Sequence, residues 1–279
     1  MVVSARPKSP GTFPFPEERT MPVVDKHNVG TPTWMDLMTT DLEKARAFYG
    51  ALFGWKFLIG PKETGYYTMC QLDGRNVAGM GQRPADAPFP PAWSLYFEVD
   101  DIDAYAARVR KHGGHVGMGP MDVMEEGRLA FCSDPTGAHF GMWQSKKHQG
   151  AKLVGEPGSM AWHEVNTRDA ARARDFYAAV FGLEPKKMEG MEYWTLHKGP
   201  QTVGGVFQMD SKWPSGVPAH WMNYFAVTDT DAAVKKVTEM GGKVHVPAMD
   251  TPYGRMATVT DPAGAAFTVI KLSPFAQSM

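Results

Sequence analysis

An internal repeat is the feature that most constrains the fold of this 279-residue chain. Residues 34–55 match residues 162–183 at ten of 22 positions, with a constant offset of 128 residues. An offset of 127 relates Asp134-Pro135 to Asp261-Pro262 further along. A register held over this length indicates a duplication, in which two similar modules follow one another.

Each copy is predicted to contain two βαβββ units. In the first unit, a strand-like segment at 33–39 precedes a helix that Asp41 caps and Gly54 ends. The apolar residues of this helix have a spacing that places them on one face: Ala45, Phe48, Tyr49, Leu52 and Phe53. The other elements expected in copy one are strands at 55–59, 66–72, 75–81 and 93–99, a helix from Asp101, and strands near 115–120, 128–133 and 138–144. Copy two repeats the plan, with helices near 170–181 and 230–240.

The expected fold class is α+β, with tandem domains whose paired βαβββ units form a cup-shaped mixed sheet with helices outside. We expect a disordered N-terminal lead at 1–30, a first domain at 31–145, a linker at 146–159 and a second domain at 160–273. The concave side of such a sheet is the place where a ligand pocket is expected.

The composition narrows the classes of function. With 29 basic and 30 acidic residues, the chain has a formal charge of −1 and shows no basic block that would bind nucleic acid. No apolar run is long enough to cross a membrane. The two cysteines, Cys70 and Cys132, are predicted to be buried free thiols, which favours a cytoplasmic protein. We expect a monomer or homodimer that binds a small molecule.

Several segments resemble the vicinal oxygen chelate superfamily, which includes glyoxalase I, extradiol dioxygenases and bleomycin-resistance proteins. The resembling segments are 41–55, 96–103, 113–114 and 127–140 in copy one, and 169–183, 224–231, 241–242 and 254–267 in copy two. The arrangement is similar to a fused two-domain, glyoxalase/bleomycin-resistance/dioxygenase-like branch. The resemblance implies the cup fold over roughly residues 30–272, and it leaves the reaction open because this scaffold carries many chemistries.

The resemblance also implies where a metal centre would lie, and those positions hold poor ligands for a hard cation. The first-strand positions are Trp34, Ser94, Trp162 and Met222. The last-strand positions are Gly141 and Thr268, and the segments 79–81 and 206–209 offer only Gln208. We therefore expect no metal cofactor. A divalent metal at a non-standard site is the alternative, for which His220 with Glu164 is the candidate pair.

Strand alternation predicts what lines the cups instead. In copy one the predicted lining is Trp34, Asp36, Met38, Ser94, Tyr96 and Glu98, and in copy two it is Trp162, Glu164, Asn166, Met222 and Tyr224. A carboxylate buried beside a tryptophan acquires a raised pKa and can act as a general acid or base. The competing interpretation is a structural acid that is bonded to the backbone or to an arginine.

His139 lies two residues before Gly141 and is expected to face cup one, where it could form an acid/base pair with Asp36 or Glu98. The candidate catalytic residues are therefore Asp36, His139 and Glu164, with copy one preferred. The other lining residues are candidate ligand contacts.

Three functions remain open from the sequence. The first is an enzyme that binds an apolar or aromatic ligand in the tryptophan-lined cups and performs metal-independent acid/base chemistry of the isomerase, cyclase or lyase type. The second is a resistance-type protein that sequesters its ligand unchanged. The third is a metal-dependent glyoxalase or dioxygenase with a relocated site.

Overall fold

The computed structural model describes residues 23–277. Within these residues, each copy forms a mixed sheet of eight strands. Sheet one has the strand order β2-β3-β4-β1-β5-β8-β7-β6, and sheet two repeats it as β10-β11-β12-β9-β13-β16-β15-β14. Strands β1 and β5 pair antiparallel at the centre of sheet one, where β1 also pairs parallel with β4 and β5 with β8. Two βαβββ units thus join through their first strands in each copy, and the predicted fold class is confirmed.

The elements of copy one are β1 (Pro32–Thr39), α1 (Leu42–Phe53), β2 (Lys56–Ile59), a 3-10 turn (Lys62–Thr64), β3 (Thr68–Leu72), β4 (Arg75–Gln82), β5 (Ala92–Glu98), α2 (Ile102–Lys111), β6 (His115–Val123), β7 (Gly127–Ser133) and β8 (His139–Ser145). Those of copy two are β9 (Met160–Thr167), α3 (Ala170–Phe181), β10 (Glu184–Lys187), β11 (Tyr193–Lys198), β12 (Gln201–Gln208), β13 (His220–Ala226), α4 (Thr230–Glu239), β14 (Lys243–Thr251), β15 (Gly254–Thr260), β16 (Ala266–Leu272) and α5 (Pro274–Gln277).

Helix α1 begins and ends where the sequence predicts. The Asp41 carboxylate accepts a hydrogen bond from the Lys44 backbone amide at 3.0 Å. Gly54 has a φ of 73°, a left-handed conformation that is open to glycine and ends the helix. The buried face includes Phe48, Tyr49 and Phe53, so the predicted apolar stripe faces the core.

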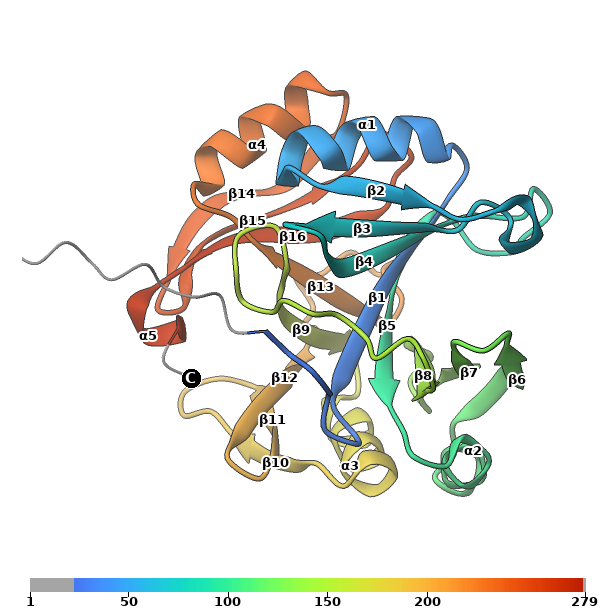
Figure 1. Cartoon of the computed structure of the whole chain (residues 1–279). Coiled ribbons are helices and arrows are strands. Elements are labelled where there is room, and N and C mark those ends of the chain that lie inside the picture. The colour runs from blue at the N-terminus through green and yellow to red at the C-terminus, as the bar shows by residue number, and fades with distance from the viewer. Residues whose placement is uncertain (1–22, 278–279) are drawn as a thin grey trace, which may run out of the picture.

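Helices α1 to α4 pack on the convex faces and bring the two copies together (Figure 1). Helix α1 lies beside α4, and α2 lies beside α3, so each contact joins one copy to the other (Figure 1). The Tyr49 hydroxyl donates to the Asp261 carboxylate at 3.1 Å, and Tyr177 donates to Asp134 at 3.0 Å. Buried side chains of both copies form one continuous hydrophobic cluster. The concave faces consequently point away from each other (Figure 1).

Two segments outside the sheets, residues 23–30 and 146–159, pack against other parts of the chain. The expectation of disorder at 1–30 is wrong for residues 23–30, because Val23 bridges Leu153 and His27 is buried with a hydrogen bond to the Ala151 carbonyl. Residues 1–22 lie outside the described residues. The predicted linker at 146–159 is packed against sheet one, where the Ala151 amide donates to the Thr33 carbonyl.

Candidate functional site

The concave face of sheet one, called cup one here, is centred on β1. Trp34 and Asp36 lie two residues apart on this strand, and each is less than a tenth exposed. Trp34 is paired with Tyr96 of β5, and Asp36 is paired with Ser94. The structure therefore places the predicted residues of β1 and β5 next to one another on one face of the sheet.

A chain of hydrogen bonds joins these residues to a tyrosine that the strand pattern did not identify. The Trp34 indole donates to the Tyr67 hydroxyl at 3.0 Å, and that hydroxyl donates to Asp36 Oδ2 at 3.2 Å. The Tyr96 hydroxyl donates to the same Oδ2 at 3.0 Å. Asp36 Oδ1 is buried and has no hydrogen-bond partner among the residues that the structure describes. One carboxylate oxygen is thus held by two phenols, and the other is free.

Burial sets the protonation equilibrium of Asp36. The loss of solvent raises the pKa of this carboxyl to about 7, although the hydrogen bonds from Tyr96 and Tyr67 oppose the change. Burial also raises the pKa of both tyrosines well above the usual value, so they remain neutral donors. Asp36 therefore exchanges its proton near neutral pH, where general acid/base catalysis is most effective.

The segment between the copies adds a second wall to this site. The His148 ring lies edge-on to Trp34, with 4.3 Å between ring centroids, and 5.5 Å from Trp143. The Trp143 indole donates to the His148 carbonyl at 2.9 Å. Burial lowers the pKa of His148 to about 4, so the ring is neutral at physiological pH. These contacts fix the orientation of Trp34 in cup one.

The concave face of sheet two, called cup two here, repeats the arrangement with one difference. Trp162 donates to the Tyr193 hydroxyl at 3.0 Å, Tyr193 donates to Glu164 Oε2 at 3.0 Å, and Tyr224 donates to Glu164 Oε1 at 2.8 Å. The longer glutamate thus gives one oxygen to each phenol, whereas Asp36 gives one oxygen to both. Burial raises the pKa of Glu164 as it does that of Asp36, although Glu164 is the more exposed of the two residues.

The strand pattern did not identify Tyr67, which directly precedes β3, or Tyr193, which begins β11, because no inward face was predicted for these segments. A signal was present in the sequence, because Tyr67 and Tyr193 are tyrosines at corresponding positions of the two copies. The pairing of β3 with β4 and of β11 with β12 has the same register at an offset of 126 residues. Both hydroxyls lie over a glycine. A Cβ atom on Gly79 would lie 2.0 Å from the Tyr67 hydroxyl, and one on Gly205 would lie 1.9 Å from the Tyr193 hydroxyl. Each glycine therefore makes room for its tyrosine.

The residues present in cup one do not fit the metal centre of the superfamily. The Tyr67 ring lies over Gly79, and the Tyr96 ring lies over Gly141, where a Cβ atom would be 2.2 Å away. Aromatic rings thus occupy space that ligand side chains on those strands would need. Within residues 23–277, no three histidine, cysteine, aspartate or glutamate side chains are grouped so that they could hold an ion.

Three other predicted residues have different surroundings. His139 is exposed at the start of β8, and within the described part of the chain it has no hydrogen bond to Asp36 or Glu98. The structure therefore does not form the predicted histidine–acid pair. Glu98 accepts a hydrogen bond from the Ser145 hydroxyl at 2.7 Å, which is a structural contact. His220 bonds the Pro218 carbonyl through Nδ1, and its strand neighbour in β9 is Asn166.

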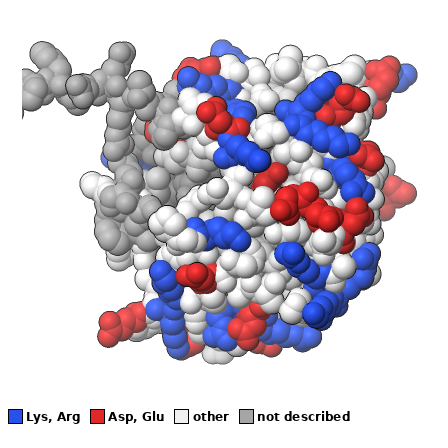
Figure 2. Space-filling model, turned by 60° about the horizontal axis from the view of Figure 1, so that its bottom comes forward, with Lys and Arg blue, Asp and Glu red and all other residues white. Residues whose placement is uncertain are grey.

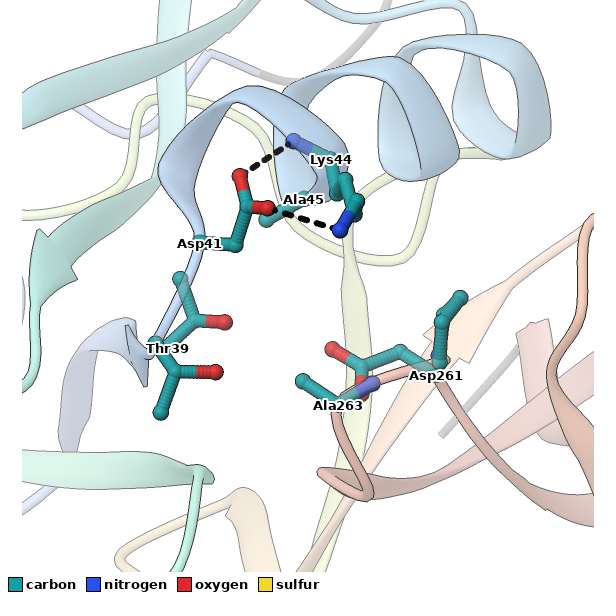
Figure 3. A pocket seen from close by; sticks show the side chains of 8 residues that line it. Thr39, Asp41, Lys44, Ala45, Asp261 and Ala263 are labelled. Carbon is teal, nitrogen blue, oxygen red and sulfur yellow. Dashed lines mark hydrogen bonds and ion pairs between the residues drawn. The ribbon is translucent and has the colours of Figure 1, made fainter.

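Two small pockets lie at the boundary between the copies rather than in the cups. Figure 3 shows the first, of about 130 Å³, between the start of α1 and the turn at Asp261–Ala263. The second, of about 210 Å³, is formed by the corresponding segments around Arg172 and Pro135. Asp41 caps α1 and pairs with Lys44 at 3.1 Å, and Asp261 accepts hydrogen bonds from the Tyr49 hydroxyl and the Ala263 amide, so the charged groups of the first pocket have partners. Neither pocket contains the tryptophan, tyrosine and acid of the cups.

The surface carries charges of both signs. On the face drawn in Figure 2, acidic and basic side chains are interspersed, in agreement with the balanced sequence charge. Among the described residues, no helix is long and apolar enough to cross a membrane.

Comparison with known proteins places this architecture in a family. Sequences of the Glyoxalase/Bleomycin resistance protein/Dioxygenase superfamily match residues 31–142 and 159–269. Similar proteins include the putative glyoxylase CFP32 of Mycobacterium tuberculosis, which is 43% identical over 262 residues, 91% of this chain and 99% of that protein. The anthracycline biosynthesis protein DnrV of Streptomyces peucetius is 38% identical over 259 residues, 87% of this chain and 94% of that protein.

Solved structures agree on the fold. The Mn(II)-bound glyoxalase from Novosphingobium aromaticivorans has a TM-score of 0.61 at 14% identity, over 88% of this chain and 83% of that one. The 2,3-dioxygenase LapB from Pseudomonas sp. KL28 has a TM-score of 0.60 at 14% identity, over 87% of this chain and 92% of that one. At this identity the likeness concerns the fold alone. Both copies match the family's sequences over nearly their whole length, and the chain belongs to the Glyoxalase/Bleomycin resistance protein/Dioxygenase superfamily.

Proposed function

We propose that the protein binds an apolar or aromatic small molecule in cup one and uses Asp36 as a metal-independent general acid and base. The observation that carries this proposal is the state of Asp36. This carboxyl is 6% exposed, has a pKa of about 7, and keeps Oδ1 without a partner among the described residues. A free, weakly solvated carboxylate oxygen at neutral pH is suited to accept or return a proton.

The surroundings of Asp36 favour an apolar ligand. Met38 and Met69 lie on the same face of sheet one and are partly exposed, as are Leu129 and Phe131 of β7. Methionine side chains adapt to irregular apolar surfaces and make favourable contacts with aromatic rings. A carbonyl-bearing aromatic ligand would therefore pack against these residues with its polar edge toward Asp36.

The proposed step is a proton transfer of the isomerase or lyase type. Asp36 Oδ1 removes a proton from a carbon next to a ligand carbonyl, and the electrons of the broken C–H bond move to that carbonyl to give an enolate. The protonated Asp36 then returns the proton to another carbon, so no oxidant or second substrate is consumed. Tyr67 and Tyr96 hold Oδ2, so Oδ1 is the oxygen that has no partner among the described residues and is left for the proton transfer.

The names of two similar proteins point to a class of ligand that can be tested. Members of the superfamily are typically enzymes, and two similar proteins are named for anthracycline biosynthesis. Anthracyclines are polycyclic aromatic ketones, which fit the apolar lining of cup one and the chemistry proposed for Asp36. We therefore choose an anthracycline aglycone as the first ligand to test.

Exchange of ligand protons with D₂O tests the proposal directly. The protein is incubated with the aglycone in D₂O, and deuterium at ligand carbon is followed by NMR. The Asp36→Asn variant should lose this exchange while its affinity for the aglycone changes by no more than about threefold, since the amide retains the shape of the side chain. The Glu164→Gln variant is the matched control and should keep the exchange. Wild-type exchange in Asp36→Asn would contradict the proposal.

The second candidate function is sequestration of the ligand without reaction. The fully paired carboxylate of Glu164 favours this function for cup two. Both oxygens of Glu164 already accept phenol hydrogen bonds, so neither is free for proton transfer. Under this alternative the aglycone binds tightly and is recovered without deuterium from wild-type protein. Metal analysis separates the third candidate, a relocated metal centre, because it requires a stoichiometric divalent ion.

A further inference from the structure

Cup two has a different lining from cup one at corresponding positions. Ser94 of cup one corresponds to Met222 of cup two, but at four other positions near the acid cup one has an apolar side chain or a glycine, whereas cup two carries an amide or hydroxyl group. The corresponding pairs, from copy one to copy two, are Met38 and Asn166, Met69 and Thr195, Phe131 and Thr258, and Gly141 and Thr268. Duplication alone would preserve the lining, so the cups have acquired different surfaces.

Aromatic rings form a connected wall on one side of cup two. The ring of Phe207 lies 6.2 Å from Tyr193 and 5.9 Å from Trp213, and Trp213 lies 6.4 Å from the His220 ring. Trp213 comes from the loop between β12 and β13, and its neighbours Phe207 and His220 lie on those strands. Phe207, Trp213 and His220 are all partly exposed, so a ligand can reach this wall from solvent. Cup one has Gly81 at the position of Phe207.

An unsatisfied amide lies beside this wall. Asn166 is 2% exposed, and its Oδ1 atom has no hydrogen-bond partner among the described residues. It is paired with Phe207 on one side and with His220 on the other, while its side chain also hydrogen-bonds Glu164. A buried acceptor without a donor destabilises the fold, so a group that brings a donor to this atom is favoured.

From the wall and the amide together, we infer that cup two is a second ligand site, for a ring that carries hydroxyl groups. The face of the ring packs against Phe207 and Trp213, and one hydroxyl donates a hydrogen bond to Asn166 Oδ1. Thr195 of β11 is partly exposed, and its Oγ1 already bonds the Lys186 carbonyl at 3.3 Å and His197 Nε2 at 2.8 Å. Its remaining lone pair can accept a hydrogen bond from a second ring hydroxyl. A hydroxylated aromatic ring and a sugar ring share this chemistry. The inference does not depend on the role proposed for Asp36.

Fluorine NMR of protein labelled with 5-fluorotryptophan tests the inference, because the chain has eight tryptophans that report on separate places. Signals of Trp34, Trp162 and Trp213 are assigned by single Trp→Phe variants. Three probes are titrated: 1,5-dihydroxynaphthalene, methyl α-glucopyranoside and naphthalene. We expect 1,5-dihydroxynaphthalene to shift the Trp162 and Trp213 signals. A response to the glucoside at these signals would instead identify a sugar ring as the preferred source of the hydroxyls.

Two variants identify the polar contact. Asn166→Leu should weaken binding of the hydroxylated probe at the Trp213 signal by about five- to tenfold, the usual effect of losing one hydrogen bond from a neutral donor. Thr195→Val removes the second hydroxyl without changing the size of the side chain, and it serves if Asn166→Leu does not fold. The matched control is Met38→Leu, the corresponding position of cup one, which should leave the Trp213 response unchanged.

The inference is overturned if neither hydroxylated probe shifts the Trp162 and Trp213 signals. It is also overturned if naphthalene shifts them with the same affinity as 1,5-dihydroxynaphthalene, because recognition would then be apolar only. Unchanged affinity in a folded Asn166→Leu or Thr195→Val variant would show that these side chains do not contact the hydroxyls.

Discussion

The buried carboxyl of Asp36 should contribute a part of the free energy of unfolding that decreases as the pH rises. The Asp36→Asn substitution isolates this part. The folded protein holds the Asp36 proton up to a pKa of about 7, whereas an unfolded aspartate releases it near its ordinary value of 3.8. Between these values the unfolded state binds fewer protons, so the contribution of Asp36 to the free energy of unfolding falls as the pH rises. The loss begins near pH 4 and is complete above about pH 7.

The magnitude follows from the size of the pKa difference. A shift of about three units corresponds to about 4 kcal/mol, at roughly 1.4 kcal/mol for each unit. Asp36→Asn removes this dependence because an amide does not titrate in this range. The free energy of unfolding of Asp36→Asn, minus that of the wild type, should therefore increase by about 4 kcal/mol from pH 4 to pH 8.

Urea unfolding of both proteins at pH values from 4 to 8 measures this difference. Contributions from groups common to both proteins cancel in the subtraction. Asp86→Asn changes an exposed loop aspartate and is the control for the loss of a charge. A constant difference for Asp36→Asn would refute the raised pKa, and a decreasing one would show that the carboxylate is stabilised in the fold.

Three further predictions concern the packing of cup one, the contact between the copies and the metal content. Gly79→Ala should lower the free energy of unfolding by about 1–3 kcal/mol, as overpacking does, because its Cβ would meet the Tyr67 hydroxyl; Gly117→Ala, whose Cβ would have ordinary contacts only, should have a much smaller effect in the same urea titration. Tyr49→Phe breaks the contact with Asp261 between the copies and should cost about 1–3 kcal/mol by thermal or urea unfolding, while the exposed Tyr66→Phe should cost almost nothing. Chelation with EDTA should leave the melting temperature unchanged and metal analysis should find substoichiometric metal; a stoichiometric ion would show that a site exists despite the rings over Gly79 and Gly141.

The repeat and the strand alternation predicted much of the architecture and the tryptophan, the acid and one tyrosine of each site. Trp34, Asp36 and Tyr96 were placed on one face because residues two apart in a strand point the same way, and the structure joins them in one set of contacts. Alternation also put His139 on this side, but the residue lies at the start of β8 and is exposed. Alternation along a strand predicts which side of the sheet a residue faces, but it does not predict how far that residue lies from the centre of the sheet.

The remaining residues of the site could not be predicted from local patterns. His148 comes from the segment between the copies, which has no periodicity from which its position against Trp34 could be inferred. Tyr67 reaches Asp36 only because the facing residue of β4 is a glycine. The bond from Tyr49 to Asp261 joins residues 212 positions apart, so it depends on the way the two copies pack. The repeat predicted that there are two copies, but not how they are arranged.

NMR titration of Asp36 measures the protonation equilibrium on which the proposed proton transfer depends. Protein labelled with ¹³C at aspartate carboxyls is titrated from pH 3 to pH 9, and the Asp36 signal is assigned by its absence from Asp36→Asn. We predict a midpoint near pH 7 for this signal, which should move upward in Tyr96→Phe because a hydrogen bond to the charged form is lost. A midpoint near the ordinary value of 3.8 would contradict it, because Asp36 would then be a fixed anion at neutral pH.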